Sequence, residues 1–161
     1  MKAPLYSRRH LLGLTGSALA WSCPLLAQGA SNALAVVVGA ASARRTLTSD
    51  ELRRIFLNKD TDSGNGERFV PINQRSGSAE RIRFDEQVLN MTAEQSARYW
   101  IDQRLRGRRA PATVGSLSML RRALNDLPGA ISYMLLADVD SSLRALSIDG
   151  HGPRDTGYPI R

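Results

Sequence analysis

Apolar residues along the chain fall into short runs divided by polar and glycine-rich stretches. The run LAVVV at residues 34–38 is rich in β-branched residues and closed by Gly39, a pattern typical of a buried strand. Residues 68–72, 130–136 and 143–148 are also apolar and short enough for strands. We therefore predict four strands, separated by segments with a different periodicity.

Two capping boxes open helices in the segments between these strands. Thr48 is followed three residues later by Glu51, and apolar residues recur at helical spacing over residues 49–57. Thr92 and Gln95 repeat the arrangement ahead of a longer helix. On that longer helix we expect the buried face to carry Ala97, Trp100, Ile101 and Leu105.

Two further helices are predicted from apolar spacing. One begins at Ala79 and ends at residues 90–91, and the other is capped by Ser116 and broken at residues 127–129. On the first of these, we expect the acidic residues to form a solvated face: Glu80, Asp85 and Glu86. Because strands and helices alternate, the predicted fold class is α/β, with a small mixed or parallel sheet flanked by helices.

The turn NQRSGS at residues 73–78 carries the main candidate chemistry. It joins a strand to the helix at Ala79, so its backbone N–H groups, hydroxyls and arginine are suited to hold an oxyanion. The candidate ligand residues are Arg75, Ser76, Gly77 and Ser78. Serine, glycine and asparagine ahead of a helix are also ordinary capping residues, so the pattern is compatible with a junction that binds nothing.

The N-terminal residues 1–27 have the character of an export signal. Lys2, Arg8 and Arg9 precede a short apolar stretch, and the paired arginines resemble a twin-arginine signal. We expect cleavage after residue 27, a flexible leader at residues 28–33, a folded domain at residues 34–161 and a periplasmic location. Cleavage ahead of Cys23 with lipid anchoring is an alternative, although Trp21 fits such a site poorly.

Composition narrows the chemistry further. A chain of 161 residues fits one domain, and its single cysteine lies in the predicted signal, which excludes thiolate metal sites and thiol nucleophiles from the mature chain. His151 is then the one remaining histidine, and the sequence has no G-x-S-x-G motif. We therefore expect a non-enzymatic protein with no metal and no cofactor.

The chain is basic, with a formal net charge of +7 that falls to +4 once Lys2, Arg8 and Arg9 are removed with the signal. In an exported protein this charge favours small anions, acidic partners or membrane surfaces over nucleic acid. A cluster follows the third predicted helix: Arg104, Arg106, Arg108 and Arg109. These arginines either complement the helix dipole or attract an anion.

Four stretches, in order, resemble one lobe of the phosphate ABC transporter substrate-binding proteins. They are LTSDELRRIFLNK at residues 47–59, VPI and RSGS at residues 70–78, PGAISY at residues 128–133, and the closing IDG and YP within residues 148–159. The resemblance covers about residues 33–160. It implies a single lobe of the type II periplasmic-binding-protein fold, with the oxyanion held at Arg75, Ser76, Gly77 and Ser78.

The resemblance also sets expectations for function. It implies an exported solute-binding protein for phosphate or a similar oxyanion, with an ABC permease, a sensor protein or a second copy of itself as partner. Full-length members close two lobes over the ligand, whereas this chain corresponds to one, so we expect weak binding. The alternative is a protein–protein interaction or signalling module that keeps the lobe fold without tight ligand binding. The sequence departs from the family pattern at Asn58 and Ser132, which replace glycine, and at Ser78, which replaces threonine. Arg75 also stands immediately before Ser76, closer than in most full-length members, and no tryptophan follows Lys59.

Overall fold

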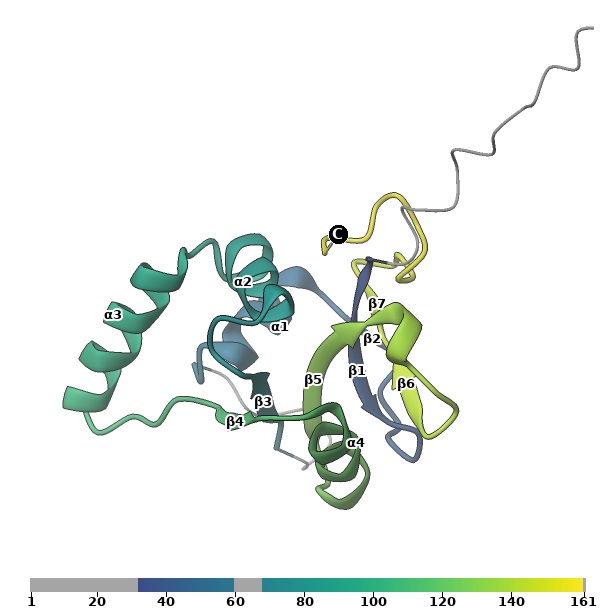
Figure 1. The fold of residues 1–161 in the computed structure, drawn as a ribbon. Helices are drawn as coiled ribbons and strands as arrows, with labels where there is room; N and C mark the ends of the chain where they lie inside the picture. The colour runs from purple at the N-terminus through teal and green to yellow at the C-terminus, as the bar shows by residue number, and fades with distance from the viewer. Residues whose placement is uncertain (1–31, 60–67, 161) are drawn as a thin grey trace, which may run out of the picture.

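The computed structural model describes residues 32–59 and 68–160, and its centre is a five-stranded mixed sheet in the order β4-β3-β5-β1-β6 (Figure 1). The central strand β5 runs parallel to β3 and antiparallel to β1, and β3 is also parallel to β4. The strands are β1 (Leu34–Gly39), β3 (Val70–Gln74), β4 (Ala112–Val114), β5 (Ala130–Leu135) and β6 (Leu143–Ala145). The predicted α/β class with a mixed sheet is confirmed.

Helices cover both faces of this sheet. They are α1 (Ser49–Phe56), α2 (Ala79–Phe84), which continues into the π-helical turn η1 (Asp85–Leu89), α3 (Ala93–Leu105), α4 (Leu117–Asp126) and the short 3-10 turn η2 (Leu136–Asp138). Helices α1 and α2 pack on one face and α4 on the other, so β1 is buried along its whole length. This two-sided burial explains why β1 reads as a continuous apolar run rather than an alternating one.

Three aromatic rings fasten α1 and α2 to the sheet. The rings of Phe84 and Tyr133 stack with centroids 3.8 Å apart, and Phe56 lies 4.6 Å from Phe84. Offset and tilted aromatic pairs add stabilisation beyond the area that they bury. Phe84 is the last residue of α2, so this cluster holds the short helix against the sheet. The turn that precedes the helix is thereby held in position as well.

Both predicted capping boxes are present. The side chain of Thr48 accepts from the backbone N–H of Glu51, whose carboxylate accepts in return from the backbone N–H of Thr48. Thr92 and Gln95 form the same pair of hydrogen bonds at the start of α3. The helices that they cap begin where the sequence predicts.

The second strand lies two residues later than predicted. Residues 73 and 74, assigned to the turn, are the last two residues of β3 and pair with Thr113 and Val114 of β4. The amide of Gln74 also donates to the carbonyl of Tyr133 at 2.9 Å. The partner strand β4 is short and mostly exposed, so no apolar pattern predicted it.

The predicted strand at residues 143–148 is two strands in two sheets. β6 pairs with β1, whereas β7 (Ser147–Ile148) pairs with β2 (Thr46–Leu47) in a separate two-stranded parallel sheet. Leu146, between them, is fully buried, and its backbone N–H donates to Val36. Both halves of the apolar run are strands, as predicted, but the chain passes from one sheet to the other at Leu146.

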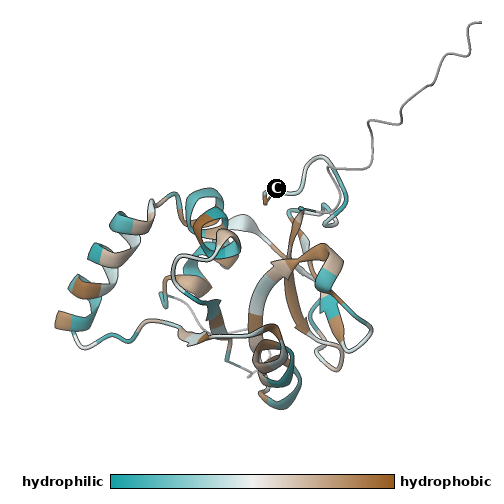
Figure 2. Cartoon of the chain, in the orientation of Figure 1, coloured by the Kyte–Doolittle hydropathy of each residue, from teal (hydrophilic) through white to brown (hydrophobic). Residues whose placement is uncertain are grey.

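The predicted buried face of α3 is wrong for three of its four members. Trp100 is 8% exposed, but Ala97 is exposed, and Ile101 and Leu105 are 59% and 84% exposed. The inward face carries Ser96, Trp100 and Gln103 instead. Figure 2 shows the hydrophobic residues towards the C-terminal end of α3, which stands at one edge of the molecule. The helix packs through a narrow face only, so most of its apolar residues are exposed.

No helix among residues 32–59 and 68–160 is long and apolar enough to span a membrane. The predicted signal at residues 1–27, including Cys23, lies outside the described residues, as does most of the leader. The division into signal, leader and domain therefore stays a prediction.

Candidate functional site

The turn between β3 and α2 is closed by two hydrogen bonds. The backbone N–H of Ser78 donates to the carbonyl of Arg75 at 3.1 Å, and the Ser78 side chain accepts from the N–H of Arg81 at 3.2 Å. Gly77 has φ +82°, and a Cβ there would meet nothing within 4 Å. A non-glycine residue would be strained at this φ, and the open space beside Gly77 leaves its backbone approachable.

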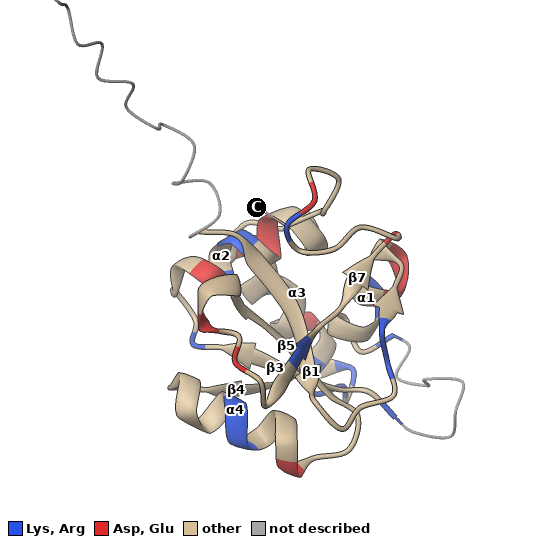
Figure 3. Cartoon of the chain, turned by 90° about the vertical axis from the view of Figure 1, so that its right-hand side faces the viewer, with Lys and Arg blue, Asp and Glu red and all other residues tan. Residues whose placement is uncertain are grey.

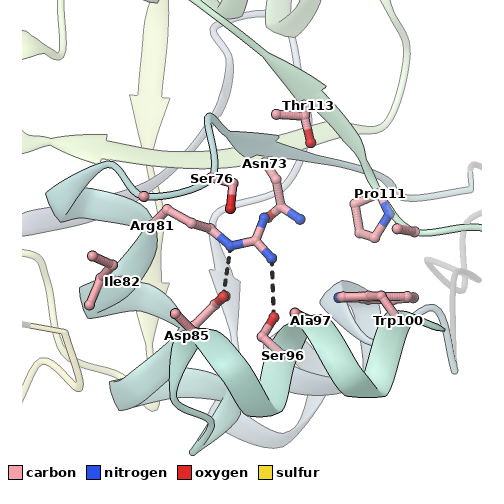
Figure 4. A pocket seen from close by; sticks show the side chains of 13 residues that line it. Asn73, Ser76, Arg81, Ile82, Asp85, Ser96, Ala97, Trp100, Pro111 and Thr113 are labelled. Carbon is pink, nitrogen blue, oxygen red and sulfur yellow. Dashed lines mark hydrogen bonds and ion pairs between the residues drawn. The ribbon is translucent and has the colours of Figure 1, made fainter. Parts of the chain in front are cut away.

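The four predicted ligand residues open onto two different cavities. Ser76 and Gly77 line a cavity of about 170 Å³, whereas Arg75 and Ser78 line another of about 190 Å³ that reaches the start of α4. We call the first cavity the α2–α3 pocket (Figure 4). Its lining residues are Asn73, Ser76, Gly77, Arg81, Ile82, Asp85, Ala93, Ser96, Ala97, Trp100, Ala110, Pro111 and Thr113.

Arg81 supplies the positive charge of the α2–α3 pocket. Its Nε donates to Asp85 Oδ2 at 2.8 Å and its Nη2 to Ser96 Oγ at 3.5 Å, so α2 and α3 both hold the guanidinium. The Arg81 side chain is only 12% exposed. In Figure 4 its guanidinium lies between Ser76 of the turn and Ser96 of α3. A guanidinium fixed in this way is pre-organised to bind an anion.

Asp85 is buried, so the prediction that it belongs to a solvated face is wrong. Asp85 is 3% exposed, because it is the first residue of η1, which packs against α3. The ion pair with Arg81 compensates its buried charge. Glu86, the next residue, is exposed as predicted. The i,i+4 spacing of Arg81 and Asp85 is the sequence signal that indicates such a pair.

Two buried polar atoms of the pocket lining have no hydrogen-bond partner among the described residues. They are Oδ1 of Asp85 and Nε1 of Trp100. An unsatisfied buried polar atom costs free energy, and such groups mark sites where a ligand or water completes the bonding. The pocket thus combines an unused acceptor and an unused donor beside a fixed cation.

Asn73 lines the pocket beside the guanidinium and is hydrogen-bonded to the buried Tyr133. The hydroxyl of Tyr133 donates to Asn73 Oδ1 at 3.3 Å, and Asn73 is 4% exposed. Burial raises the pKa of Tyr133 far above its ordinary value, against a smaller opposing effect of the nearby Arg81 charge. The phenol is therefore a neutral hydrogen-bonding group, and the pocket carries one cation and one carboxylate.

Sequence reasoning placed Ser76 and Gly77 correctly at the turn but did not identify the residues opposite them. The missed residues are Asn73, Arg81, Asp85, Ser96 and Trp100. Four of these lie on the helices that follow, and their convergence depends on how α3 packs against η1. The ligand roles of Arg75 and Ser78 stay predictions, because their cavity is separate from the pocket that holds Arg81.

The arginine cluster at the end of α3 is exposed. Arg106 pairs with Asp102 at 3.1 Å, four residues earlier, which is an ordinary surface contact that favours the helix end. On the face of the molecule drawn in Figure 3, acidic and basic residues are interspersed on α2 and α4. No group of three or more potential metal ligands occurs in the part of the chain that the structure describes.

The chain matches no protein-family model. Its fold, however, is similar to solved structures of phosphate transport proteins. These include an ABC-type phosphate transport receptor from Vibrio cholerae, with a TM-score of 0.65 and 18% identity over 80% of this chain and 53% of that one. PstS from Borrelia burgdorferi matches with a TM-score of 0.61 and 18% identity, over the same shares of the two chains.

A third similar structure contains a ligand. It is a putative phosphate ABC transporter substrate-binding protein from Clostridium perfringens with bound phosphate, with a TM-score of 0.61 and 20% identity over 75% of this chain and 46% of that one. The chain therefore spans about half the length of these proteins. The resemblance drawn from the sequence motifs is confirmed at the level of the fold: the chain has the fold of a single lobe of the phosphate ABC transporter substrate-binding proteins.

Proposed function

We propose that the protein is a non-enzymatic solute-binding protein that takes phosphate or a similar oxyanion in the α2–α3 pocket. Ser76 and Gly77 supply hydroxyl and N–H donors, and Arg81 supplies the charge. The observation that carries the proposal is the guanidinium of Arg81, 12% exposed and held from both sides, facing the turn. The bound phosphate of the Clostridium perfringens protein, which shares this fold, supports the choice of ligand.

The same geometry limits the affinity. Ser76 and Gly77 are exposed, so water competes for their donors, and Asp85 offsets part of the positive charge of Arg81. Arg75 is exposed and lines the neighbouring cavity, so solvent screens its charge. We therefore expect weak binding that falls as salt is added.

Substitution of Arg81 by lysine tests this assignment. Lysine keeps the charge beside Asp85 but cannot make the forked contacts of a guanidinium. We expect Arg81→Lys to weaken phosphate binding about tenfold, as measured by isothermal titration, in line with a charge-assisted hydrogen bond. Arg83→Lys is the matched control, because Arg83 is on the same helix but donates to the carbonyl of Asn32, away from the pocket. Equal losses in the two variants, or no phosphate binding by the wild type, would contradict the proposal.

We further propose export to the periplasm through residues 1–27. The support is the arginine pair at Arg8 and Arg9 ahead of a short apolar stretch. The double substitution Arg8→Lys, Arg9→Lys is expected to retain the unprocessed chain in the cytoplasm, as measured by fractionation. A Cys23→Ser variant separates lipid anchoring from simple cleavage, because only a lipoprotein would lose its membrane association. Unchanged export of the double variant contradicts the twin-arginine route.

A second candidate function is protein–protein interaction, and the outward face of α3 favours it. Ile101 and Leu105 lie one turn apart, are largely exposed and have Arg98 and Arg104 beside them on the helix surface. Exposed apolar residues surrounded by charge are typical of a contact surface. The partner would be a permease, a sensor or a second copy of the chain. Site-specific crosslinking from Ile101 in periplasm tests this, and labelling of the bait alone argues against it.

A further inference from the structure

The α2–α3 pocket has two chemically different ends. The turn and Arg81 form a polar end together with Asn73, Asp85 and Ser96. Most of the remaining lining is apolar: Ile82, Ala93, Ala97, Ala110 and Pro111, with the ring of Trp100. In Figure 4, Trp100 and Pro111 lie together on one side of the guanidinium and Ile82 on the other. A bare inorganic anion could use the polar end only.

The size of the pocket leaves room beyond an anionic head. Its volume is about 170 Å³, whereas one water molecule occupies about 30 Å³ in the liquid. Drug-sized ligands need pockets of about 300 Å³ or more. The space therefore suits a head group with a short substituent. Two of the wall residues on α3 are alanines, Ala93 and Ala97, and their small side chains leave that space open.

The charge of the pocket also favours a ligand with an organic substituent over a bare anion. Arg81 is paired with Asp85, so the two together are close to neutral, and Asp85 Oδ1 is an unsatisfied acceptor in the lining. A carboxylate at this position repels a doubly charged anion more than a singly charged one. An alkyl group in place of one oxygen on phosphorus makes the second ionisation harder. Near neutral pH an alkylphosphonate therefore carries more of its singly charged form than inorganic phosphate and meets less repulsion.

We propose that the pocket prefers a small organic oxyanion, a phosphate-like head that carries a short apolar substituent, over inorganic phosphate. This rests on the proposed function, because the head occupies the same donors at Ser76, Gly77 and Arg81. The substituent packs against Trp100 and Ala97. Removal of its apolar surface from water supplies the preference.

Isothermal titration of the full chain with ethylphosphonate and with inorganic phosphate tests the preference. We expect ethylphosphonate to bind about tenfold more tightly, which corresponds to about 1.4 kcal/mol. Equal or weaker binding of ethylphosphonate overturns this inference and leaves the proposed function standing if phosphate binds. The absence of binding by both anions overturns the two together.

A variant with a larger side chain in the pocket provides a second test of the inference. Ala97→Leu places a larger side chain on the exposed surface of α3 at the apolar end, so we expect the ratio of the two affinities to fall to about one. Ile101→Ala, one turn along on the outward face, is the matched control and should keep the wild-type ratio. A tenfold preference that survives in the Ala97→Leu variant would show that the preference arises elsewhere and would overturn the inference.

Discussion

At the scale of single residues, the ion pair between Arg81 and Asp85 links stability to binding. Asp85 is 3% exposed and its Oδ2 lies 2.8 Å from Arg81 Nε, so the carboxylate is withdrawn from water and depends on one cation. Breaking a buried pair is destabilising because it leaves a charge uncompensated. The same carboxylate competes with any anion for the guanidinium.

Asp85→Asn separates these two effects. We expect it to lower the free energy of unfolding by about 3 kcal/mol, measured by urea denaturation, because Arg81 loses its buried partner. We also expect phosphate to bind more tightly, because the guanidinium is no longer neutralised. Glu86→Gln, on the exposed neighbour, should change neither quantity. A variant that loses stability and binds phosphate no better would show that the pocket does not use Arg81.

At the scale of elements, local rules set the helix starts, and long-range packing sets almost everything else. Thr48 and Thr92 cap their helices as the sequence predicts, because a capping box is complete within four residues. Strand β4 could not be predicted, because its three mostly exposed residues are held in place by pairing with β3, which is distant in sequence. The orientation of α3 likewise depends on its contact with η1, so the exposure of Ile101 and Leu105 had no local signal.

In the candidate site, too, the residues of the local turn could be predicted and those that depend on long-range packing could not. Ser76 and Gly77 were found because they belong to a turn that is local in sequence. Arg81 and Asp85 were not, because an i,i+4 pair on a helix is usually solvated and only the packing of α3 buries it. The hydroxyl of Ser132, at a position where the family has glycine, is buried and donates to the carbonyl of Ile72 at 2.7 Å, which ties β5 to β3.

The capping box of α1 gives a prediction at this scale. Thr48→Ala should lower the free energy of unfolding by about 1 kcal/mol, with Thr46→Ala on the exposed edge of β2 as control. The backbone N–H of Thr48 lowers the pKa of Glu51 below its ordinary value of 4.5. This contribution to stability is therefore present above pH 4.5 and is lost as the pH falls through the lowered pKa. Acid unfolding of Glu51→Gln checks the sign, because Thr48→Ala keeps the backbone N–H that binds the carboxylate. An acid profile of Glu51→Gln identical to that of the wild type would contradict it.

At the scale of the whole molecule, the C-terminal segment closes one end of the core. The buried hydroxyl of Tyr158 accepts from the backbone N–H of Val36 at 3.0 Å and donates to the carbonyl of Leu146 at 3.3 Å. It thereby joins strand β1 to the residue at which the chain passes from one sheet to the other. Sequence position alone gave no indication of this contact, which spans most of the domain.

Tyr158→Phe measures what this closure contributes. We expect a loss of about 1 to 3 kcal/mol in the free energy of unfolding, because the N–H of Val36 is left without a partner in the core. Burial also raises the pKa of Tyr158 from 10.0 to about 12. The wild type should therefore keep this stabilisation below pH 10 and lose it between pH 10 and about 12, while the variant loses less. Identical alkaline unfolding profiles would contradict this account.

The fold and the pocket together make one claim about function, that an oxyanion binds between the turn and α3. A phosphate titration followed by amide and arginine side-chain chemical shifts tests it most directly. We predict that Ser76, Gly77 and the Nε–H of Arg81 shift together and saturate at one phosphate concentration, while Gly115, in the neighbouring cavity, stays unchanged. Shifts centred on Arg75 and Gly115, or no saturable shifts at Gly77 and Arg81, would contradict the account.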